Sequence, residues 1–254
     1  MSKKRRLKRV LKDGRTVIVP MDHGISKPIS GLEELERVLR DVDGIVDAIV
    51  LHKGIAKNVK YVEEMESALI IHLSASTCLT EPNEKVLVTS VEKAIKLGAD
   101  AVSIHVNIGS KTEKEQLRDF GMVSEICDDW NMPLLAMVYA RGEGLNERDP
   151  ELVKHCVRVA YELGADIVKT AYTGSVESFA EVVEFAEIPI VIAGGSKKSE
   201  FEILKEVADA ISAGASGVAI GRNVFQHKDP KAMVKALRRI VHENASLEEI
   251  GVIV

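Results

Sequence analysis

Eight short apolar runs recur along the chain, and a stretch compatible with a helix separates each run from the next. The runs are rich in Val, Ile and Leu and do not alternate cleanly with polar residues, which is typical of parallel strands buried on both faces. They are residues 17–21, 48–51, 69–73, 101–106, 134–138, 166–171, 190–193 and 217–220. The pattern predicts eight parallel strands that alternate with helices.

Signals for helix starts stand between the runs. Asp149 before Pro150 places an N-cap residue ahead of a proline at the first helical position. A Ser or Thr three positions before a Glu has the spacing of a capping box. These pairs are Ser30 with Glu33, Thr112 with Glu115, and Ser199 with Glu202. We therefore predict helices that begin near these four points.

Three joints from helix to strand repeat one pattern, at residues 97–102, 163–168 and 213–218. In each, a glycine able to adopt the left-handed conformation ends a helix, and a small residue leads into a strand. Such joints with eight strands predict an α/β fold, a (β/α)8 TIM barrel. A doubly wound open sheet is the alternative, but no Gly-x-Gly-x-x-Gly follows the first run. Because no linker or composition break divides the chain, we predict a single barrel domain over residues 1–254.

Composition and charge limit the partners. Of the 254 residues, 46% are hydrophobic and 29% are charged, which suits a sizeable core under a soluble surface. The net charge of −5 argues against general affinity for nucleic acid. The basic start is interpreted as a solvated helix over about residues 2–12, and an arm for an anionic partner is the alternative.

Neither a membrane span nor an export signal is indicated. No apolar stretch approaches the roughly 18 residues of a membrane span, and no signal-peptide core follows the basic start. The three cysteines, Cys78, Cys127 and Cys156, have no paired spacing. This suits reduced thiols that serve mostly in packing. We expect a cytoplasmic protein.

Lys169 stands inside the apolar run 166–171, where strand alternation puts it on one face with Ile167 and Ala171. Burial disfavours an ammonium and favours the neutral amine. A neutral amine is a nucleophile for a carbonyl carbon and forms Schiff bases. The alternative is a lysine at a strand end whose ammonium reaches water.

Asp22 and Tyr139 end the first and fifth predicted strands, at the side of a barrel where active sites lie. Their parity aims both side chains toward Lys169. A carboxylate there stabilises the ammonium and shuttles protons, and a phenol exchanges a proton with a substrate oxygen or carbanion. The alternatives are a cap or turn role for Asp22 and an aromatic plug for Tyr139.

Glycines follow the last two predicted strands. Gly194 and Gly195 follow the seventh, and Gly221 with Arg222 follows the eighth, which matches the usual phosphate site of this fold. Glycines let the backbone approach the dianion, and Arg222 adds charge. Two tight turns that need glycine for their geometry are the alternative.

Histidines at four successive strands offer a second chemistry, since three of them could ligate zinc. They are His23, His52, His72 and His105. No His-x-His or His-Glu-x-x-His spacing occurs, so we predict no metal site. Hydrogen-bonded polar layers or contacts to substrate hydroxyls are the other interpretation. Lys53 is a rival nucleophile, but it faces away from the interior if the adjacent His52 faces inward.

Four strings resemble the archaeal-type class I aldolases, a family of fructose-bisphosphate aldolases and 2-amino-3,7-dideoxy-D-threo-hept-6-ulosonate synthases. They are MDHG at 21–24, LHKG at 51–54, VKTAYTG at 168–174 and GRNVFQH at 221–227. The resemblance extends from about residue 16 to residue 244, and the string NERDPE at 146–151 is similar to the synthases. Met137 stands where the bisphosphate aldolases carry tryptophan, which also favours the synthases. Ala140 replaces the usual proline, so the loop after Tyr139 is less rigid.

The resemblance implies a Schiff base on Lys169, a proton acceptor at Asp22 and a proton donor at Tyr139. It implies that Gly194, Gly195, Gly221 and Arg222 bind the substrate phosphate. It also implies that the sugar is lined by two segments, whose further residues are His23, Gly24, Ile25, Ser26, Ala140 and Arg141. No metal or organic cofactor is implied, because the imine is the electron sink. A homo-oligomer, commonly a decamer, is implied as well.

The activity expected from this resemblance is that of a Schiff-base aldolase or transaldolase. It would condense a fragment of 6-deoxy-5-ketofructose 1-phosphate with L-aspartate semialdehyde, giving 2-amino-3,7-dideoxy-D-threo-hept-6-ulosonate for dehydroquinate and aromatic amino acid synthesis. The alternative is fructose-1,6-bisphosphate aldolase, whose second phosphate would need an anchor such as Lys27, Lys53 or Arg141. More distant alternatives are a metal-dependent lyase or isomerase and a non-catalytic phosphate-binding barrel.

Overall fold

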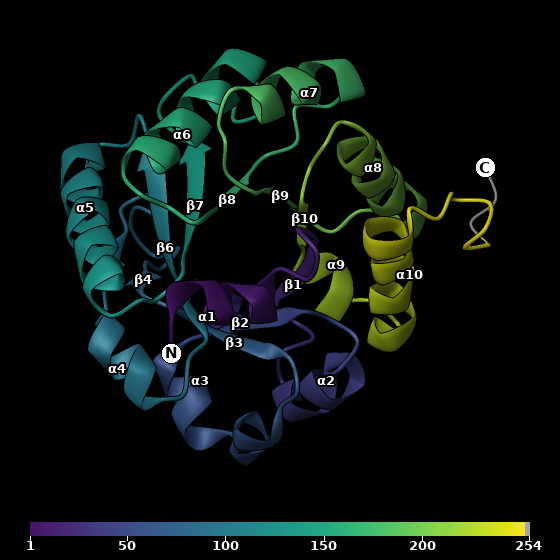
Figure 1. Ribbon diagram of the computed structural model, residues 1–254, viewed down its shortest axis with the longest axis horizontal. Coiled ribbons are helices and arrows are strands. Elements are labelled where there is room, and N and C mark those ends of the chain that lie inside the picture. Colours follow the sequence, from purple (N-terminus) through teal and green to yellow (C-terminus); the bar gives the residue numbers. More distant parts are fainter. Residues whose placement is uncertain (252–254) are drawn as a thin grey trace.

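A closed barrel of parallel strands forms the centre of the protein, and helices surround it (Figure 1). The computed structural model describes residues 1–251, so the last three residues of the predicted domain lie outside it. The strand order is β1-β10-β9-β8-β7-β6-β3-β2. The strands are β1 (Thr16–Pro20), β2 (Ala48–Leu51), β3 (Ala68–His72), β6 (Ala101–Ile108), β7 (Leu134–Ala140), β8 (Ile167–Thr170), β9 (Ile190–Ala193) and β10 (Gly217–Ala219). The predicted (β/α)8 barrel is confirmed.

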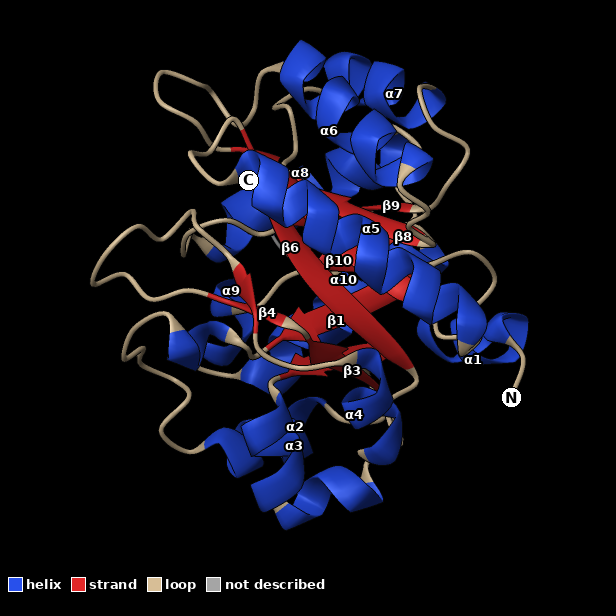
Figure 2. Ribbon diagram, turned by 90° about the vertical axis from the view of Figure 1, so that its left-hand side faces the viewer, coloured by secondary structure: helices blue, strands red, loops and turns tan. Residues whose placement is uncertain are grey.

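Helices alternate with the strands, and most of them pack against the outside of the barrel (Figure 2). They are α1 (Lys3–Val10), α2 (Leu35–Val42), α3 (Lys53–Asn58), α4 (Val91–Lys96), α5 (Glu113–Asp129), α6 (Pro150–Glu162), α7 (Val176–Glu184), α8 (Glu200–Ser212), α9 (Arg222–Phe225) and α10 (Pro230–Glu243), with 3-10 turns η1 (His23–Ile25) and η2 (Lys60–Glu64). A small antiparallel pair, β4 (Ser74–Ala75) and β5 (Val86–Leu87), follows β3. Within residues 1–251, no helix is long and apolar enough to cross a membrane.

Two apolar layers explain why the strand sequences do not alternate. The inner layer fills the barrel with side chains such as Ile18, Val50 and Leu135, and the outer layer packs the opposite strand faces against the helices. Both faces of each strand are therefore buried, and both select apolar residues. Interior-facing polar residues occur near the carboxyl ends of the strands, which places the polar site there.

Helix α1 lies across the amino-terminal end of the barrel (Figure 1). Its last residue Val10 and the following Leu11 belong to the inner apolar layer. Its basic side chains pair with carboxylates near the strand starts, with Lys3 Nζ 3.1 Å from Asp166 and Arg9 Nε 2.8 Å from Asp100. The basic segment is thus a helix as predicted, but it closes the barrel instead of lying free in solvent.

Two of the predicted helix starts have the expected capping bonds. The backbone N–H of Glu202 donates to Ser199 Oγ, and the Glu202 carboxylate accepts from the Ser199 N–H, so this capping box is confirmed. Asp149 caps α6 in a similar way, by accepting from the first backbone N–H groups of that helix. Thr112 precedes α5, but its side chain makes no capping bond.

The predicted helix start at Ser30 is wrong, because α2 begins at Leu35. The Glu33 carboxylate accepts from the Gly31 N–H at 2.6 Å, and Ser30 Oγ accepts from Gln226 Nε2 at 3.1 Å. These side chains therefore close a turn ahead of the helix instead of capping it.

Asp47 ties three elements together at the amino-terminal end of the barrel. Its fully buried carboxylate accepts from the Val17 N–H at 2.7 Å and contacts His242 Nε2 of α10 at 2.7 Å and Lys12 Nζ at 3.3 Å. Burial raises the pKa of this carboxyl, but the bonds from His242 and Val17 outweigh burial and hold the pKa below its usual value.

We expect Asp47→Ala to lower the free energy of unfolding by about 3 kcal/mol, because it removes one partner of a buried charge pair. A group whose pKa is depressed in the folded state contributes stability above its ordinary pKa of about 4 and loses it as the pH falls further. Urea unfolding of both proteins should therefore show the full difference at pH 7 and a shrinking difference below pH about 4. An equal difference at all pH values would contradict the role of the carboxylate charge.

Candidate active site

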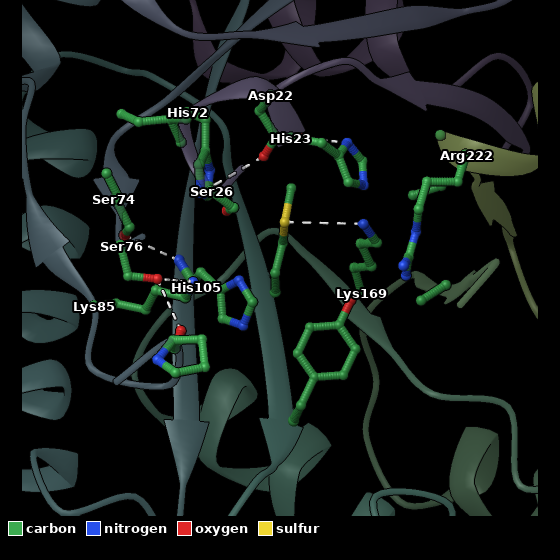
Figure 3. A pocket seen from close by; sticks show the side chains of 18 of the residues that line it. Asp22, His23, Ser26, His72, Ser74, Ser76, Lys85, His105, Lys169 and Arg222 are labelled. Atoms are coloured by element: carbon green, nitrogen blue, oxygen red, sulfur yellow. Dashed lines mark hydrogen bonds and ion pairs between the residues drawn. The ribbon is translucent and has the colours of Figure 1, made fainter. Parts of the chain in front are cut away.

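A cavity of about 350 Å³ lies at the carboxyl ends of the barrel strands (Figure 3). All the predicted site residues line it except Gly24 and Ala140. Ala140 is next to the inward-facing Tyr139, so its side chain faces the helices and packs in the outer apolar layer. The residues brought together are Asp22, His23, Ile25, Ser26, Tyr139, Arg141, Lys169, Gly194, Gly195, Gly221 and Arg222.

Lys169 projects from β8 into this cavity and is only 8% exposed. Its Nζ lies 3.9 Å from the sulfur of Met137, a soft and weakly polar neighbour. Burial lowers the pKa of the amine to about 8, the Asp22 carboxylate opposes this, and the charges of Arg141 and Arg222 lower the pKa further. A useful fraction of the amine is therefore neutral near neutral pH.

Asp22 follows β1 and lines the same cavity as Lys169, with its carboxylate directed toward His72 (Figure 3). Its carboxylate oxygens lie 3.4 Å from His23 Nδ1 and 3.7 Å from His72 Nε2. Burial raises the pKa of this carboxyl, but its attraction to His72, His23 and Lys169 outweighs burial and lowers the pKa well below the usual range. Asp22 is therefore an ionised carboxylate in the same cavity as the amine.

Tyr139 ends β7 with its ring packed between two polar neighbours. The His105 ring centroid lies 5.2 Å from that of Tyr139, and the Arg141 guanidinium lies 4.2 Å from the same ring. Arg141 is held by Glu147 through a 2.7 Å ion pair. Burial raises the pKa of the Tyr139 phenol above its usual value, so the phenol stays protonated near neutral pH.

Two of the four histidines, His72 and His105, form hydrogen-bonded pairs with neutral side chains, whereas neither ring nitrogen of His52 has a partner within the described residues. His72 Nδ1 lies 2.8 Å from Ser103 Oγ, and His105 Nε2 lies 2.9 Å from Asn107 Oδ1. Burial lowers the pKa of His72 to about 4 and that of His105 well below its usual value. Across residues 1–251, no three His, Cys, Asp or Glu side chains are grouped to hold a metal ion. The arrangement agrees with the hydrogen-bonded polar layer considered above.

The loops after β9 and β10 are locked to each other by Asn223, a buried residue that sequence reasoning gave no role. Its Nδ2 donates to the carbonyls of Gly194 and Ser196 at 3.1 and 3.2 Å, and its Oδ1 accepts from the Lys198 N–H at 2.8 Å. A side chain at Gly221 would collide with the Pro20 carbonyl and the His23 ring. These glycines therefore bring backbone close to the cavity, and no alanine fits at Gly221.

Lys53, the rival nucleophile, does not line the cavity. It is exposed at the start of α3, and its ammonium donates to the Val88 carbonyl. Sequence reasoning missed a polar wall contributed by the segment between β4 and β5, whose cavity-lining residues are Ser76, Asn83 and Lys85. The only signal was Lys85 directly before the apolar run 86–88, which is too short to predict as a strand.

The chain resembles known aldolases over nearly its whole length. Residues 16–227 match the family described as DeoC/LacD family aldolase. The chain is 57% identical over 98% of its length to 2-amino-3,7-dideoxy-D-threo-hept-6-ulosonate synthase 1 of Archaeoglobus fulgidus, of which 95% is covered. It is 48% identical to the 2-amino-4,5-dihydroxy-6-oxo-7-(phosphonooxy)heptanoate synthase of Streptomyces griseus, with 91% of this chain and 86% of the relative covered.

Solved structures of aldolases are also similar to this chain. One of them is an archaeal fructose-1,6-bisphosphate aldolase whose catalytic lysine is covalently bound to the carbinolamine intermediate of its substrate. It superposes with a TM-score of 0.85 at 31% identity, and the match covers 94% of this chain and 99% of that one. A catalytic lysine that binds its substrate covalently therefore occurs on the same fold in a protein that shares 31% of the aligned sequence.

Proposed function

Because this chain belongs to the DeoC/LacD family of aldolases, we propose that it transfers a fragment of 6-deoxy-5-ketofructose 1-phosphate to L-aspartate semialdehyde through a Schiff base on Lys169. The product is 2-amino-3,7-dideoxy-D-threo-hept-6-ulosonate, as the name of the Archaeoglobus fulgidus relative suggests, for use in aromatic amino acid synthesis. The observation that carries this proposal is the buried Lys169 amine, which shares one cavity with Asp22 and Tyr139.

Each of these three side chains has a proposed task. The neutral amine of Lys169 adds to the keto carbon, and Asp22 moves the protons that convert the carbinolamine into an imine and water. The imine takes up the electron pair of the breaking carbon–carbon bond while Asp22 accepts the proton of the β-hydroxyl, an aldehyde fragment leaves, and an enamine remains on Lys169. The enamine carbon then attacks the acceptor aldehyde, whose oxygen takes a proton from Tyr139, and the proton held by Asp22 returns to the phenolate. Water finally releases the product and restores Lys169.

We assign the donor phosphate to the loops after β9 and β10. Gly194, Gly195 and Gly221 let the backbone approach a dianion, and Arg222 supplies charge. Within residues 1–251 the buried Arg222 Nε has no hydrogen-bond partner, which leaves it for a ligand. A 7-deoxy product requires transfer of the methyl-bearing fragment, so the phosphate leaves with the aldehyde fragment. His23, Ile25, Ser26 and Arg141 line the path of the sugar.

The proposal also includes a cytoplasmic homo-oligomer, commonly a decamer in the family that the sequence resembles. Free cysteines support a reducing compartment: Cys127 and Cys156 are buried, and burial raises the pKa of each thiol to about 12. Sedimentation velocity measures the assembly directly, and a purely monomeric species would contradict this part of the proposal.

Substrate comparison tests the proposed activity. Fructose-1,6-bisphosphate aldolase is the second candidate, favoured by the likeness to the archaeal aldolase structure. We expect kcat/KM for 6-deoxy-5-ketofructose 1-phosphate with aspartate semialdehyde to exceed that for fructose 1,6-bisphosphate cleavage by about 10²-fold, the effect of roughly two charged hydrogen bonds. Met137 gives the cavity an apolar wall, and Glu147 already neutralises Arg141, which weakens Arg141 as an anchor for a second phosphate. Of the other anchors considered, Lys27 lines the cavity and Lys53 does not.

The substrate comparison should also include dihydroxyacetone phosphate as the donor. The product name of the Streptomyces griseus relative retains a phosphonooxy group, which this donor would supply. Mass spectrometry of the products distinguishes a 7-deoxy from a 7-phosphorylated compound. Equal kcat/KM values for the condensation and for bisphosphate cleavage would contradict the proposed preference.

A further inference from the structure

A buried pair of side chains on neighbouring strands has no task in the mechanism so far. His72 of β3 and Ser103 of β6 are register partners in the barrel sheet, and they are 4% and 0% exposed. His72 Nδ1 lies 2.8 Å from Ser103 Oγ, and the other ring nitrogen, Nε2, lies 3.7 Å from Asp22 Oδ2 (Figure 3). The pair thus connects the barrel interior with the carboxylate that we assign to proton transfer.

The Ser103 hydroxyl decides which ring nitrogen of His72 carries the proton. Burial lowers the pKa of His72 to about 4, although Asp22 opposes this, so the ring is neutral near neutral pH and has one N–H. Within residues 1–251, Ser103 Oγ has no hydrogen-bond partner other than His72 Nδ1. A buried hydroxyl that donated to nothing would lose a hydrogen bond, so Ser103 donates and Nδ1 accepts. The proton of the ring is therefore on Nε2, the nitrogen near Asp22.

The His72 imidazole is held in this orientation by a second contact. The His52 ring packs against it edge-on, with ring centroids 5.3 Å apart and an interplanar angle of 63°. The 3.7 Å between Nε2 and Asp22 Oδ2 is longer than a hydrogen bond, so the N–H acts on the carboxylate through its dipole. This dipole attracts the ionised form of Asp22 at Oδ2, while Oδ1 lies 3.4 Å from His23 Nδ1. The carboxylate thus lies between two imidazoles.

We propose that Ser103 fixes His72 as the Nε2–H tautomer, and that His72 in this form positions the Asp22 carboxylate for its proton transfers. This inference rests on the proposed function, in which Asp22 accepts the proton of the β-hydroxyl and later returns it to the Tyr139 phenolate. Both ring nitrogens of His72 are occupied, Nδ1 by the Ser103 hydroxyl and Nε2 by its own proton. The transferred proton therefore stays on Asp22, where it is available for that return. Ser103 and His72 are positioning residues, because they act through Asp22.

Single-turnover cleavage of the keto-sugar phosphate tests this role. Ser103→Ala should lower the rate at saturating substrate about 10-fold, the effect of one hydrogen bond. The half-saturating concentration should change little, because Ser103 is fully buried and lies outside the cavity.

Substitutions of His72 separate the N–H from the ring. His72→Leu removes the N–H and should slow cleavage at least as much as Ser103→Ala. His72→Gln should recover most of the rate, since its amide also presents an N–H toward Asp22. Ser124→Ala is the matched control, because Ser124 is a buried serine of α5 outside the cavity, and it should leave the rate unchanged.

A double-mutant cycle shows whether the pair acts through Asp22. Ser103→Ala combined with Asp22→Asn should be no slower than Asp22→Asn alone, because the carboxylate that the pair positions is already absent. The final extent of borohydride trapping on Lys169 shows that each variant still has a folded cavity. A further loss of about 10-fold in the double variant would assign the pair to another group and overturn the inference.

Nitrogen-15 NMR of the ligand-free enzyme with labelled histidine tests the tautomer without turnover. Magic-angle-spinning spectra suit a large assembly, and the His72 signals are those that His72→Gln lacks. We expect His72 to be protonated on Nε2 alone, with an Nδ1 signal shifted by the hydrogen bond from Ser103. In Ser103→Ala, the Nδ1 signal should move to the position of a nitrogen without a hydrogen bond.

Three further results would overturn the inference. The first is a wild-type His72 that is protonated on Nδ1. The second is an unchanged Nδ1 signal together with an unchanged cleavage rate in Ser103→Ala. The third is an equal cleavage rate in His72→Gln and His72→Leu, which decides the question even if Ser103→Ala does not fold. By contrast, an enzyme that has the Nε2–H tautomer and the Ser103 hydrogen bond but never cleaves the keto-sugar phosphate would overturn the proposed function alone.

Discussion

Lys169→Ala should abolish borohydride trapping of the keto-sugar phosphate and reduce turnover by about 10⁵-fold or more, because no other amine takes the place of the nucleophile. Peptide mass spectrometry of the reduced wild-type adduct should map the modification to Lys169. Lys53→Ala is the matched control, since Lys53 is an exposed lysine outside the cavity and should leave trapping intact. An adduct on Lys53, or on Lys85, would contradict the assignment.

The pH dependence of trapping gives a second test, because the pKa of Lys169 fixes whether the rate rises or falls with pH. The pKa of Lys169 is lowered to about 8, so the rate of imine formation should rise with pH up to about 8 and then level off. The Asp22 carboxylate raises this pKa, whereas Arg141 and Arg222 lower it. Asp22→Asn should therefore move the midpoint to lower pH. A midpoint near 10, the ordinary value for lysine, would show that the amine is not desolvated.

Tyr139→Phe should slow the condensation step by about 10²- to 10⁴-fold while Lys169 stays trappable, because the phenol is needed for proton transfer and not for imine formation. The substitution keeps the ring that packs on His105 and Arg141, so the wall of the cavity persists. Single-turnover measurements with preformed imine isolate the carbon–carbon bond step.

The matched control for this variant is Tyr161→Phe, a tyrosine on α6 that stacks with Arg158 outside the cavity. It should leave both trapping and condensation unchanged. Because burial raises the pKa of the Tyr139 phenol, the wild-type rate should also show no loss from phenol ionisation between pH 7 and pH about 10. Wild-type condensation rates in Tyr139→Phe would assign the proton donor to another group.

Local sequence was sufficient to predict the barrel. Each strand is a short apolar run buried on both faces, and Gly98, Gly164 and Gly214 end helices with φ values of 81°, 85° and 99°. Such features depend on nearest neighbours in the chain and on burial alone. The inward orientation of Lys169 and Tyr139 followed from strand alternation in the same way. The failed helix start at Ser30 shows the limit, because a capping-box spacing also fits a turn closed by Glu33.

Local patterns of this kind could not predict contacts between segments that are far apart in the sequence. Asn223 locks two loops across a separation of 29 residues, and Asn83 is fixed by Gln116 across 33 residues. The strands β4 and β5 have only two residues each, which leave no periodic pattern to detect. The sequence therefore did not predict Lys85 as a site residue, although Lys85 lines the same cavity as Lys169.

By itself, the sequence determined the barrel, the strand that carries Lys169 and the side of the barrel on which the polar residues gather. These properties follow from hydrophobic pattern, glycine placement and strand parity, which act over a few residues. Only the tertiary structure decided which polar groups share the cavity, which charges are neutralised and how far burial lowers the pKa of Lys169. Desolvation and charge interactions depend on distance in space, and that distance is fixed only when the barrel closes.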